Sequence, residues 1–169
     1  MTRYLLDTNI FSQATKPAPS EALLGWLADQ VDENLFISTL SLAEIWRGIL
    51  EKVEGRRRRE LEAWFSGPEG PQALFAGRIL AFDEPAALIW ARLLAEGTAA
   101  RQPRSALDMV VAAIAEANGC VVVTSNGKHF APVVSILNPL RAKGTRVYCG
   151  LEPSRFARVL PLLIEEGRC

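Results

Sequence analysis

The stretch YLLDTN, residues 4–9, passes from one aromatic and two aliphatic residues directly to Asp7, Thr8 and Asn9. A short apolar run that ends in polar residues is typical of a buried strand. In an open parallel sheet, ligands bind in the crevice outside the carboxyl ends of the strands, where each strand turns into the next helix. The stretch therefore predicts a first strand whose end places Asp7 where such folds carry out chemistry.

The rest of the chain alternates between strand-like and helix-like patterns. Besides residues 4–6, short apolar or β-branched runs bounded by charged residues, Gly or Pro occupy residues 35–38, 78–82, 120–124 and 133–137. Between these runs, apolar residues recur at helical spacing over residues 23–27, 42–53, 88–94 and 107–114. This alternation predicts an α/β domain of three layers, α/β/α, with a central, mostly parallel sheet of about five strands.

Two segments depart from this alternation. Residues 67–77 are rich in Gly and Pro and are predicted to form a loop. After residue 139 the alternating pattern stops, and Pro161 would break the single helix-like apolar run of the tail. We therefore expect one domain over residues 1–140, followed by a C-terminal extension, residues 141–169, that has no clear place in the sheet.

Composition limits the class of protein. The 169 residues are 49% hydrophobic and 22% charged, which suits one globular domain. Nineteen basic residues balance nineteen acidic ones, so no overall field indicates a nucleic-acid or membrane partner. The first apolar run contains an acid, which argues against a secretory signal, and no apolar run approaches the ~20 residues that cross a bilayer. Both features predict a cytoplasmic protein. Cys120, Cys149 and Cys169 fit neither a disulfide framework nor a zinc cluster, and we expect reduced thiols.

Polar residues stand at several of the expected strand-to-helix turns. Asp7 ends the first strand, and Glu44 lies in the first turn expected for the helix after the second strand. Asp108 lies in the first turn expected for a later helix, and Asn126 follows the apolar run of residues 120–124. An Asx turn would also explain the amide at position 126. Because the carboxyl ends of parallel strands share one edge of a sheet, we expect these side chains to lie close together.

Each acid also has an ordinary structural explanation. Glu44 follows Ser41, and Asp108 follows Ser105, at the three-residue spacing of a capping box, in which the two side chains bond free amide groups at a helix start. Asp7 suits a helix cap. Taken singly, none of these residues indicates a site, and the hypothesis depends on their convergence.

Convergence would have an electrostatic consequence. Carboxylates held close together repel one another, and one takes up a proton unless a cation compensates. Oxygen ligands without a suitably placed His or Cys favour Mg²⁺, or Mn²⁺, which keeps several waters and uses one or two direct carboxylates. We therefore expect Asp7 and Asp108 to bind the metal ion, and Glu44 and Asn126 to hold water molecules of the ion or the substrate.

Further residues are candidates for supporting roles. Thr8, Asn9 and Thr39 are expected to orient the carboxylates by hydrogen bonds, as metal sites require. Arg47, one turn after Glu44 on the same helix, is a candidate substrate contact. His129, the single His of the chain, stands next to Phe130 and is interpreted as a packed or turn-stabilising residue rather than a general base.

Basic residues could hold a nucleic acid at such a site. Residues 56–59 form the densest positive run, and Arg101 and Arg104 precede Asp108. Arginines at these positions could pair with phosphates. The alternative is a solvated helix face, which we favour for residues 56–59.

Five phrases occur in an order that resembles a known family. LLDTN, AEIWRG, SALDMVVAAIAEANG, VVVTSNGKHF and VSILNP, read in sequence between residues 4 and 139, are similar to a PIN domain, in particular the VapC-type ribonuclease toxins of bacterial toxin–antitoxin pairs. DTN alone would be a weak signal. The order and context of the phrases make the resemblance specific.

The resemblance implies a metal-dependent endoribonuclease. Asp7, Glu44 and Asp108 match the three acids of the family pattern, and Asn126 stands where many members have a fourth acid. The missing charge makes one metal ion a safer expectation than two. RNA cleavage by metal-activated water, leaving 5′-phosphate and 3′-hydroxyl ends, is implied, and it needs no protein nucleophile.

The resemblance also implies partners. VapC-type proteins form homodimers and are silenced by a cognate VapB-type antitoxin, whose C-terminal segment crosses the groove of the active site. An alternative function is a catalytically inactive, PIN-like scaffold that binds RNA or a protein and uses its acids as helix caps. A receiver-like phosphotransfer domain is less favoured, because no Lys follows a late strand in the way that chemistry needs.

Overall fold

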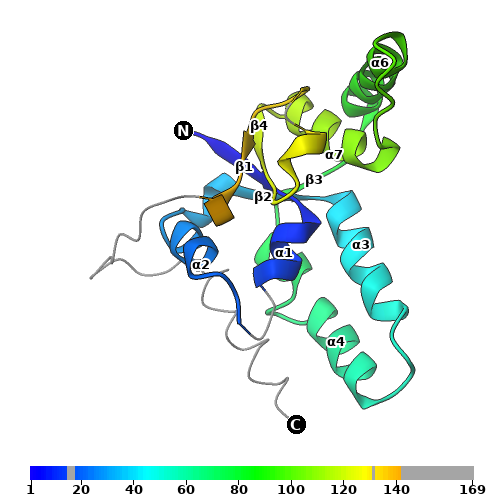
Figure 1. The fold of residues 1–169 in the computed structure, drawn as a ribbon. Helices are drawn as coiled ribbons and strands as arrows, with labels where there is room; N and C mark the ends of the chain where they lie inside the picture. Colours follow the sequence, from blue (N-terminus) through cyan, green and yellow to red (C-terminus); the bar gives the residue numbers. More distant parts are fainter. Residues whose placement is uncertain (15–17, 131, 142–169) are drawn as a thin grey trace.

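The sheet places the first strand in the centre (Figure 1). A computed structural model describes residues 1–14, 18–130 and 132–141. In this part of the chain, five parallel strands pair in the order β3-β2-β1-β4-β5. They are β1 (Arg3–Leu6), β2 (Leu35–Ser38), β3 (Ile79–Leu80), β4 (Cys120–Val123) and β5 (Ile136–Leu137). The predicted parallel sheet is confirmed, and the end of β1 lies at the middle of its carboxyl edge.

Helices cover both faces of this sheet. The α-helices are α1 (Thr8–Ala14), α2 (Glu21–Ala28), α3 (Thr39–Leu50), α4 (Arg56–Ser66), α5 (Pro71–Leu74), α6 (Glu84–Ala99) and α7 (Ala106–Ala117). The same described residues also form short 3₁₀ helices, η1 (Asp32–Asn34), η2 (Gly127–His129) and η3 (Pro139–Arg141). Helices α1 and α2 lie on one face, and α6 and α7 lie on the other (Figure 1). The three-layer α/β/α architecture is therefore confirmed.

The strands are apolar on both faces because both faces are buried. Leu6 and Val123 pack with α1 and α2, whereas Leu5, Phe36 and Val122 pack with α6 and α7. This division follows from the alternation of side chains along a strand. Within the described ranges, no helix is long and apolar enough to cross a membrane.

The segment predicted as a loop contains a short helix. Residues 67–77 include α5, which begins with Pro71 at a first-turn position, where proline's missing N–H costs nothing. Leu74 and Phe75 are buried in the core, so this segment contributes to packing rather than only connecting two elements. Gly77 (φ 75°) then adopts the left-handed conformation that glycine permits, and the chain enters β3.

Other boundaries also differ from the prediction. Helix α3 ends at Leu50, and Val53, expected within it, is 90% exposed. Strands β3 and β5 are two residues long, shorter than the predicted runs, because each lies at an edge of the sheet with one neighbouring strand. The extension beyond Arg141 lies outside the described residues, so its expected lack of a place in the sheet remains a prediction.

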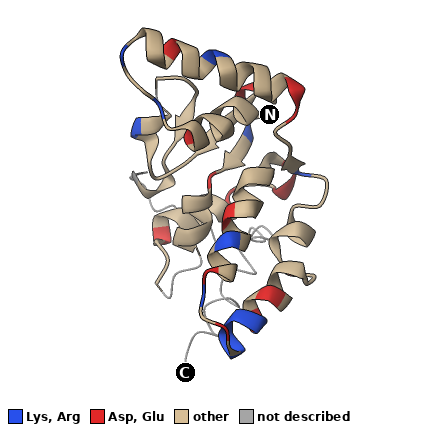
Figure 2. Cartoon of the chain, turned by 90° about the vertical axis from the view of Figure 1, so that its right-hand side faces the viewer, with Lys and Arg blue, Asp and Glu red and all other residues tan. Residues whose placement is uncertain are grey.

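Helices α3 and α4 form a hairpin that projects from the sheet (Figure 1). Trp46 and Phe65 join the two helices, with ring centroids 4.8 Å apart. The basic run lies near the tip of this hairpin (Figure 2), where Arg56 pairs with Glu60 and Arg58 with Glu62 at the i,i+4 spacing. These ion pairs agree with the solvated helix face favoured for the run.

Candidate functional site

Asp7 lies at the centre of the carboxyl edge and is 9% exposed. Its backbone N–H donates to the carbonyl of Val123 (3.0 Å). This hydrogen bond extends the pairing of β1 with β4 by one residue beyond the end of β1. Its carboxylate accepts from the N–H of Thr8 (2.8 Å), from the amide of Asn9 (2.5 Å) and from the hydroxyl of Thr124 (2.8 Å). The side chain is therefore held in one orientation by its neighbours.

The pKa of the Asp7 carboxyl is raised above its ordinary value. Burial is the largest cause, and the negative charges of Glu44 and Asp108 raise this pKa further. Hydrogen bonds from Thr124 and Thr8 oppose the shift. Glu44 and Asp108 are thus each close enough to Asp7 to act on its carboxyl electrostatically.

Thr124 connects the ends of β1 and β4 and was not predicted as a site residue. Its fully buried hydroxyl accepts from the Asn9 amide (2.9 Å) and from the backbone N–H of Asn126 (3.0 Å), and donates to Asp7. The side-chain oxygen Oδ1 of Asn9 also accepts from the backbone N–H of Ser125 (3.0 Å). The sequence feature that could have identified Thr124 as a site residue is its hydroxyl, which directly follows the apolar run of β4.

Glu44 reaches the site from α3. The hydroxyl of Thr8 donates to its carboxylate, so Thr8 connects Glu44 to Asp7. The expected place of Glu44 in the first helical turn is wrong, because α3 is capped by Ser38, whose hydroxyl accepts from the N–H of Ser41 (2.9 Å). Glu44 therefore stands in the second turn, and its predicted capping box with Ser41 is not formed.

Two of the predicted supporting residues on α3 have other contacts. Thr39 is exposed, and its hydroxyl accepts from the N–H of Phe82 (3.4 Å) rather than contacting an acid in the described part of the chain. Arg47 lies one turn beyond Glu44 and pairs with Glu51 (3.4 Å). Both side chains of that pair are about two-thirds exposed (65% and 67%).

Asp108 stands in the first turn of α7, as predicted. Ser105 caps this helix, and its hydroxyl accepts from the N–H of Asp108 (3.3 Å), which is half of a capping box. The carboxylate of Asp108 lies 2.6 Å from Nδ1 of His129 on η2. The amide of Asn126 is 3.4 Å from the same ring nitrogen.

His129 contacts Asp108, a contact that the sequence interpretation did not predict. The predicted packing is wrong, because Phe130 is buried while the His129 side chain is 53% exposed. The predicted turn-stabilising role agrees with the place of His129 in η2, where its ring lies 3.4 Å from the amide of Asn126. The ring reaches Asp108 only because η2 follows β4 and lies next to the start of α7, a neighbourhood that local pattern does not reveal.

Comparison with known proteins agrees with this geometry. Residues 4–134 match the family model described as PIN domain. The chain belongs to the PIN-domain family. The resemblance seen in the sequence is therefore confirmed, and the acids described above occupy the carboxyl edge of a PIN domain.

Relatives of this PIN domain share most of its length. Toxin FitB of Neisseria gonorrhoeae is 34% identical over 136 residues, which cover 80% of this chain and 96% of the relative. VapC ribonuclease Y4jK of Sinorhizobium fredii is 33% identical over 136 residues, with the same coverage of 80% and 96%. The crystal structure of FitAcB from Neisseria gonorrhoeae superposes with a TM-score of 0.77 and 31% identity, covering 82% of this chain and 99% of that chain.

Proposed function

We propose that this PIN domain is a Mg²⁺-dependent endoribonuclease toxin of a toxin–antitoxin pair, which hydrolyses RNA phosphodiesters. The observation that carries the proposal is the buried carboxylate of Asp7, whose pKa is raised by burial and by Glu44 and Asp108 at the same edge of the sheet. The names of two relatives, a toxin and a VapC ribonuclease, support the same activity.

The residues at this edge fit a hard divalent cation. Burial and the negative charges of Glu44 and Asp108 disfavour the ionised form of Asp7, so a bound cation would compensate its charge. Among residues 1–14, 18–130 and 132–141, no group of three or more His, Cys, Asp or Glu side chains is gathered to hold a metal ion. Mg²⁺ or Mn²⁺ matches this sparse set, because such ions keep several waters and take one or two protein carboxylates.

Each residue of the edge then has a role in RNA hydrolysis. Asp7 and Asp108 would hold the ion, and Glu44 and Asn126 would hold water or substrate. When bound, Mg²⁺ neutralises the phosphodiester and lowers the pKa of a water molecule.

The surrounding residues fix the positions of these acids. Asn9 and Thr124 keep the carboxylate of Asp7 in place, and Thr8 holds Glu44 toward it. The reaction uses water as the nucleophile, so no side chain forms a covalent bond to RNA.

Partners and location belong to the same proposal. A cognate VapB-type antitoxin would silence the protein by covering the acidic edge, and the protein would act on RNA in the cytoplasm as a homodimer. The names Toxin FitB and FitAcB of similar proteins support a toxin–antitoxin pair.

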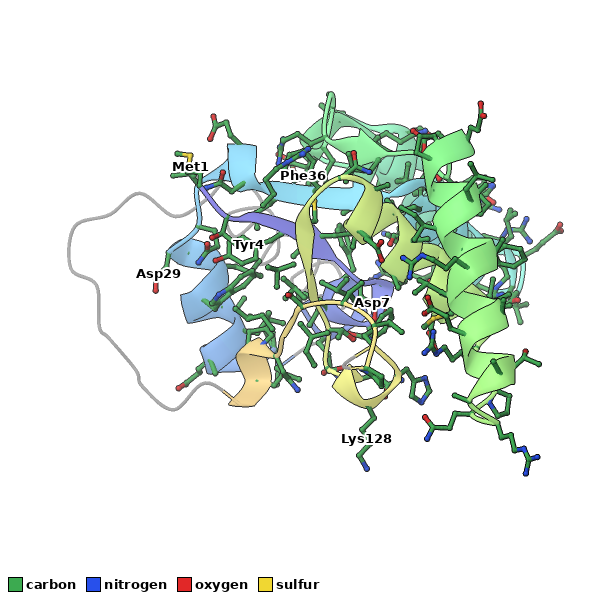
Figure 3. All side chains as sticks on the ribbon, turned by 90° about the horizontal axis from the view of Figure 1, so that it is seen from above. Met1, Tyr4, Asp7, Asp29, Phe36 and Lys128 are labelled. Carbon is green, nitrogen blue, oxygen red and sulfur yellow. The ribbon has the colours of Figure 1, made fainter. Side chains whose placement is uncertain are left out.

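Mapping the ends of RNA fragments tests the activity. The purified protein should cleave RNA in Mg²⁺ and not in chelator, and the fragments should carry 5′-phosphate and 3′-hydroxyl ends. Asp7→Asn should abolish cleavage. Asp29→Asn is the matched control, because Asp29 is exposed after α2, well away from Asp7 (Figure 3).

Three results would contradict the proposal. They are cleavage that survives chelation, cleavage that survives Asp7→Asn, and fragments that end in 2′,3′-cyclic phosphate. RNA binding without any cleavage in Mg²⁺ would favour the inactive scaffold.

A further inference from the structure

Two hollows border the acidic edge. The first, of about 340 Å³, lies between α1, α3 and α4 and is lined by Thr8 and Glu44 of the edge and by Lys52 and Arg57. Its lining also includes the apolar or aromatic residues Phe11, Ile45, Ile49, Leu61 and Trp64.

The second hollow, of about 240 Å³, lies where the start of α7 meets η2 and is lined by Arg104, Ser105, Lys128 and His129. Among the residues that the structure describes, its lining contains no carboxylate. Each hollow is thus lined both by a residue of the site, Glu44 or His129, and by basic residues.

The order of the strands puts these hollows on opposite sides of Asp7. The first is reached through Glu44, on the helix that follows β2, and the second through His129, on the turn that follows β4. Because β1 lies between β2 and β4, Asp7 stands between the two hollows. Glu44 lines the first hollow, His129 of the Asp108–His129 pair lines the second, and Glu44 and Asp108 both act electrostatically on Asp7.

Each hollow contains one lysine that is free to bind an anion. In the first, Arg57 has Glu60 within 3.8 Å, and in the second, Arg104 has Glu96 within 3.6 Å and donates to the carbonyl of Leu93 (2.6 Å). Within the described ranges, neither Lys52 nor Lys128 has a carboxylate at ion-pairing distance. Lys128 extends outward from η2 (Figure 3).

We propose that a single strand of RNA crosses the acidic edge from one hollow to the other, with Lys52 and Lys128 each binding a backbone phosphate that flanks the cleaved bond. This inference rests on the proposed function and names the path of its substrate. A polynucleotide carries an anion on each side of any phosphodiester, which matches a lysine on each side of the acids. A single strand can bend its phosphates into two separate hollows, whereas a duplex presents them on a fixed helical surface.

Salt dependence of RNA binding tests this path. Each lysine that neutralises a phosphate of a single strand contributes about 0.7 to the slope of log K against log salt concentration. We expect Lys52→Ala and Lys128→Ala each to lower the magnitude of this slope by about 0.7, and the double variant by about 1.4. The loss should be similar for RNAs of different sequence, because lysines that bind phosphates do not read bases.

The measurement uses Asp7→Asn protein in metal-free potassium chloride, so that the RNA stays intact. Arg92→Ala is the matched control, because it removes the same charge from α6, outside both hollows, where Arg92 pairs with Glu96 and Glu116. Its slope should equal that of the parent. In the otherwise unaltered protein with Mg²⁺, the lysine variants should raise KM and leave kcat unchanged.

The possible results separate this path from the proposed function. Cleavage by the unaltered protein with unchanged slopes in both lysine variants would overturn the path alone. Reduced slopes without cleavage would support the path and overturn the nuclease. A poly(Glu) peptide that binds through Lys52 and Lys128, while RNA slopes stay constant, would assign the hollows to an acidic protein partner and overturn the path.

Discussion

Replacing Thr124 by Val should destabilise the metal-free protein by about 2–4 kcal/mol. The hydroxyl that is lost donates to Asp7 and accepts from Asn9 and from the backbone of Asn126, and it is fully buried. A hydrogen bond to a charged group contributes about 1.5–3 kcal/mol, and a neutral one about 0.5–1.5 kcal/mol. Asn9 keeps its bond to Asp7, so the expected cost is that of the lost bond to Asp7 plus that of one neutral bond, from the N–H of Asn126, which gives the total of about 2–4 kcal/mol.

Urea unfolding in chelator measures this cost. With an m-value of about 2 kcal/mol per molar urea, the midpoint should fall by about 1–2 M. Thr98→Val is the control, because Thr98 is exposed and its hydroxyl donates to the Leu94 carbonyl of its own helix (3.1 Å). Its effect should stay within about 0.5 kcal/mol. A midpoint for Thr124→Val equal to that of the control would refute the argument that this hydroxyl holds the site together.

Three further outcomes are expected. In chelator, the raised pKa of Asp7 makes ionisation of this carboxyl unfavourable in the folded state, so its contribution to stability falls as pH rises from its ordinary pKa of 3.8 through the raised value. The melting temperature of Asp7→Asn relative to that of the unaltered protein should therefore increase with pH. A difference that stays constant with pH would contradict this expectation. Saturating Mg²⁺ should raise the melting temperature of the unaltered protein but not that of Asp7→Asn, and equal shifts would place the ion elsewhere. Cys120 is buried, and burial raises the pKa of its thiol, so in a Cys149→Ser, Cys169→Ser protein this thiol should react with a thiol reagent only after unfolding; rapid native labelling would argue against its burial.

The elements that depend on local pattern were predictable from the sequence. The run before Asp7 forms β1, and the apolar run before Thr124 forms β4, because a doubly covered strand needs apolar residues on both faces. The edge strands were predicted too long, because pattern does not reveal where pairing with a neighbour stops.

The details of the site depend on contacts between distant parts of the chain. The predicted position of Glu44 was one turn too early, because Ser38 and Ser41 are both residues that suit a helix N-cap. The helix begins after Ser38, because β2 ends there. Thr124 as a site residue and the contact of His129 with Asp108 were missed for a related reason. Their partners lie 117 and 21 residues away, and the pairing of β1 with β4 and the position of η2 beside α7 bring them together.

The most direct test of the central claim is the position of Mn²⁺ in a crystal of the protein, found from its anomalous scattering. A peak between the carboxylates of Asp7 and Asp108, absent in Asp7→Asn crystals soaked in the same way, is the predicted result. No peak at this edge under saturating Mn²⁺, or a peak bound only by other residues, would contradict a metal-dependent nuclease site there.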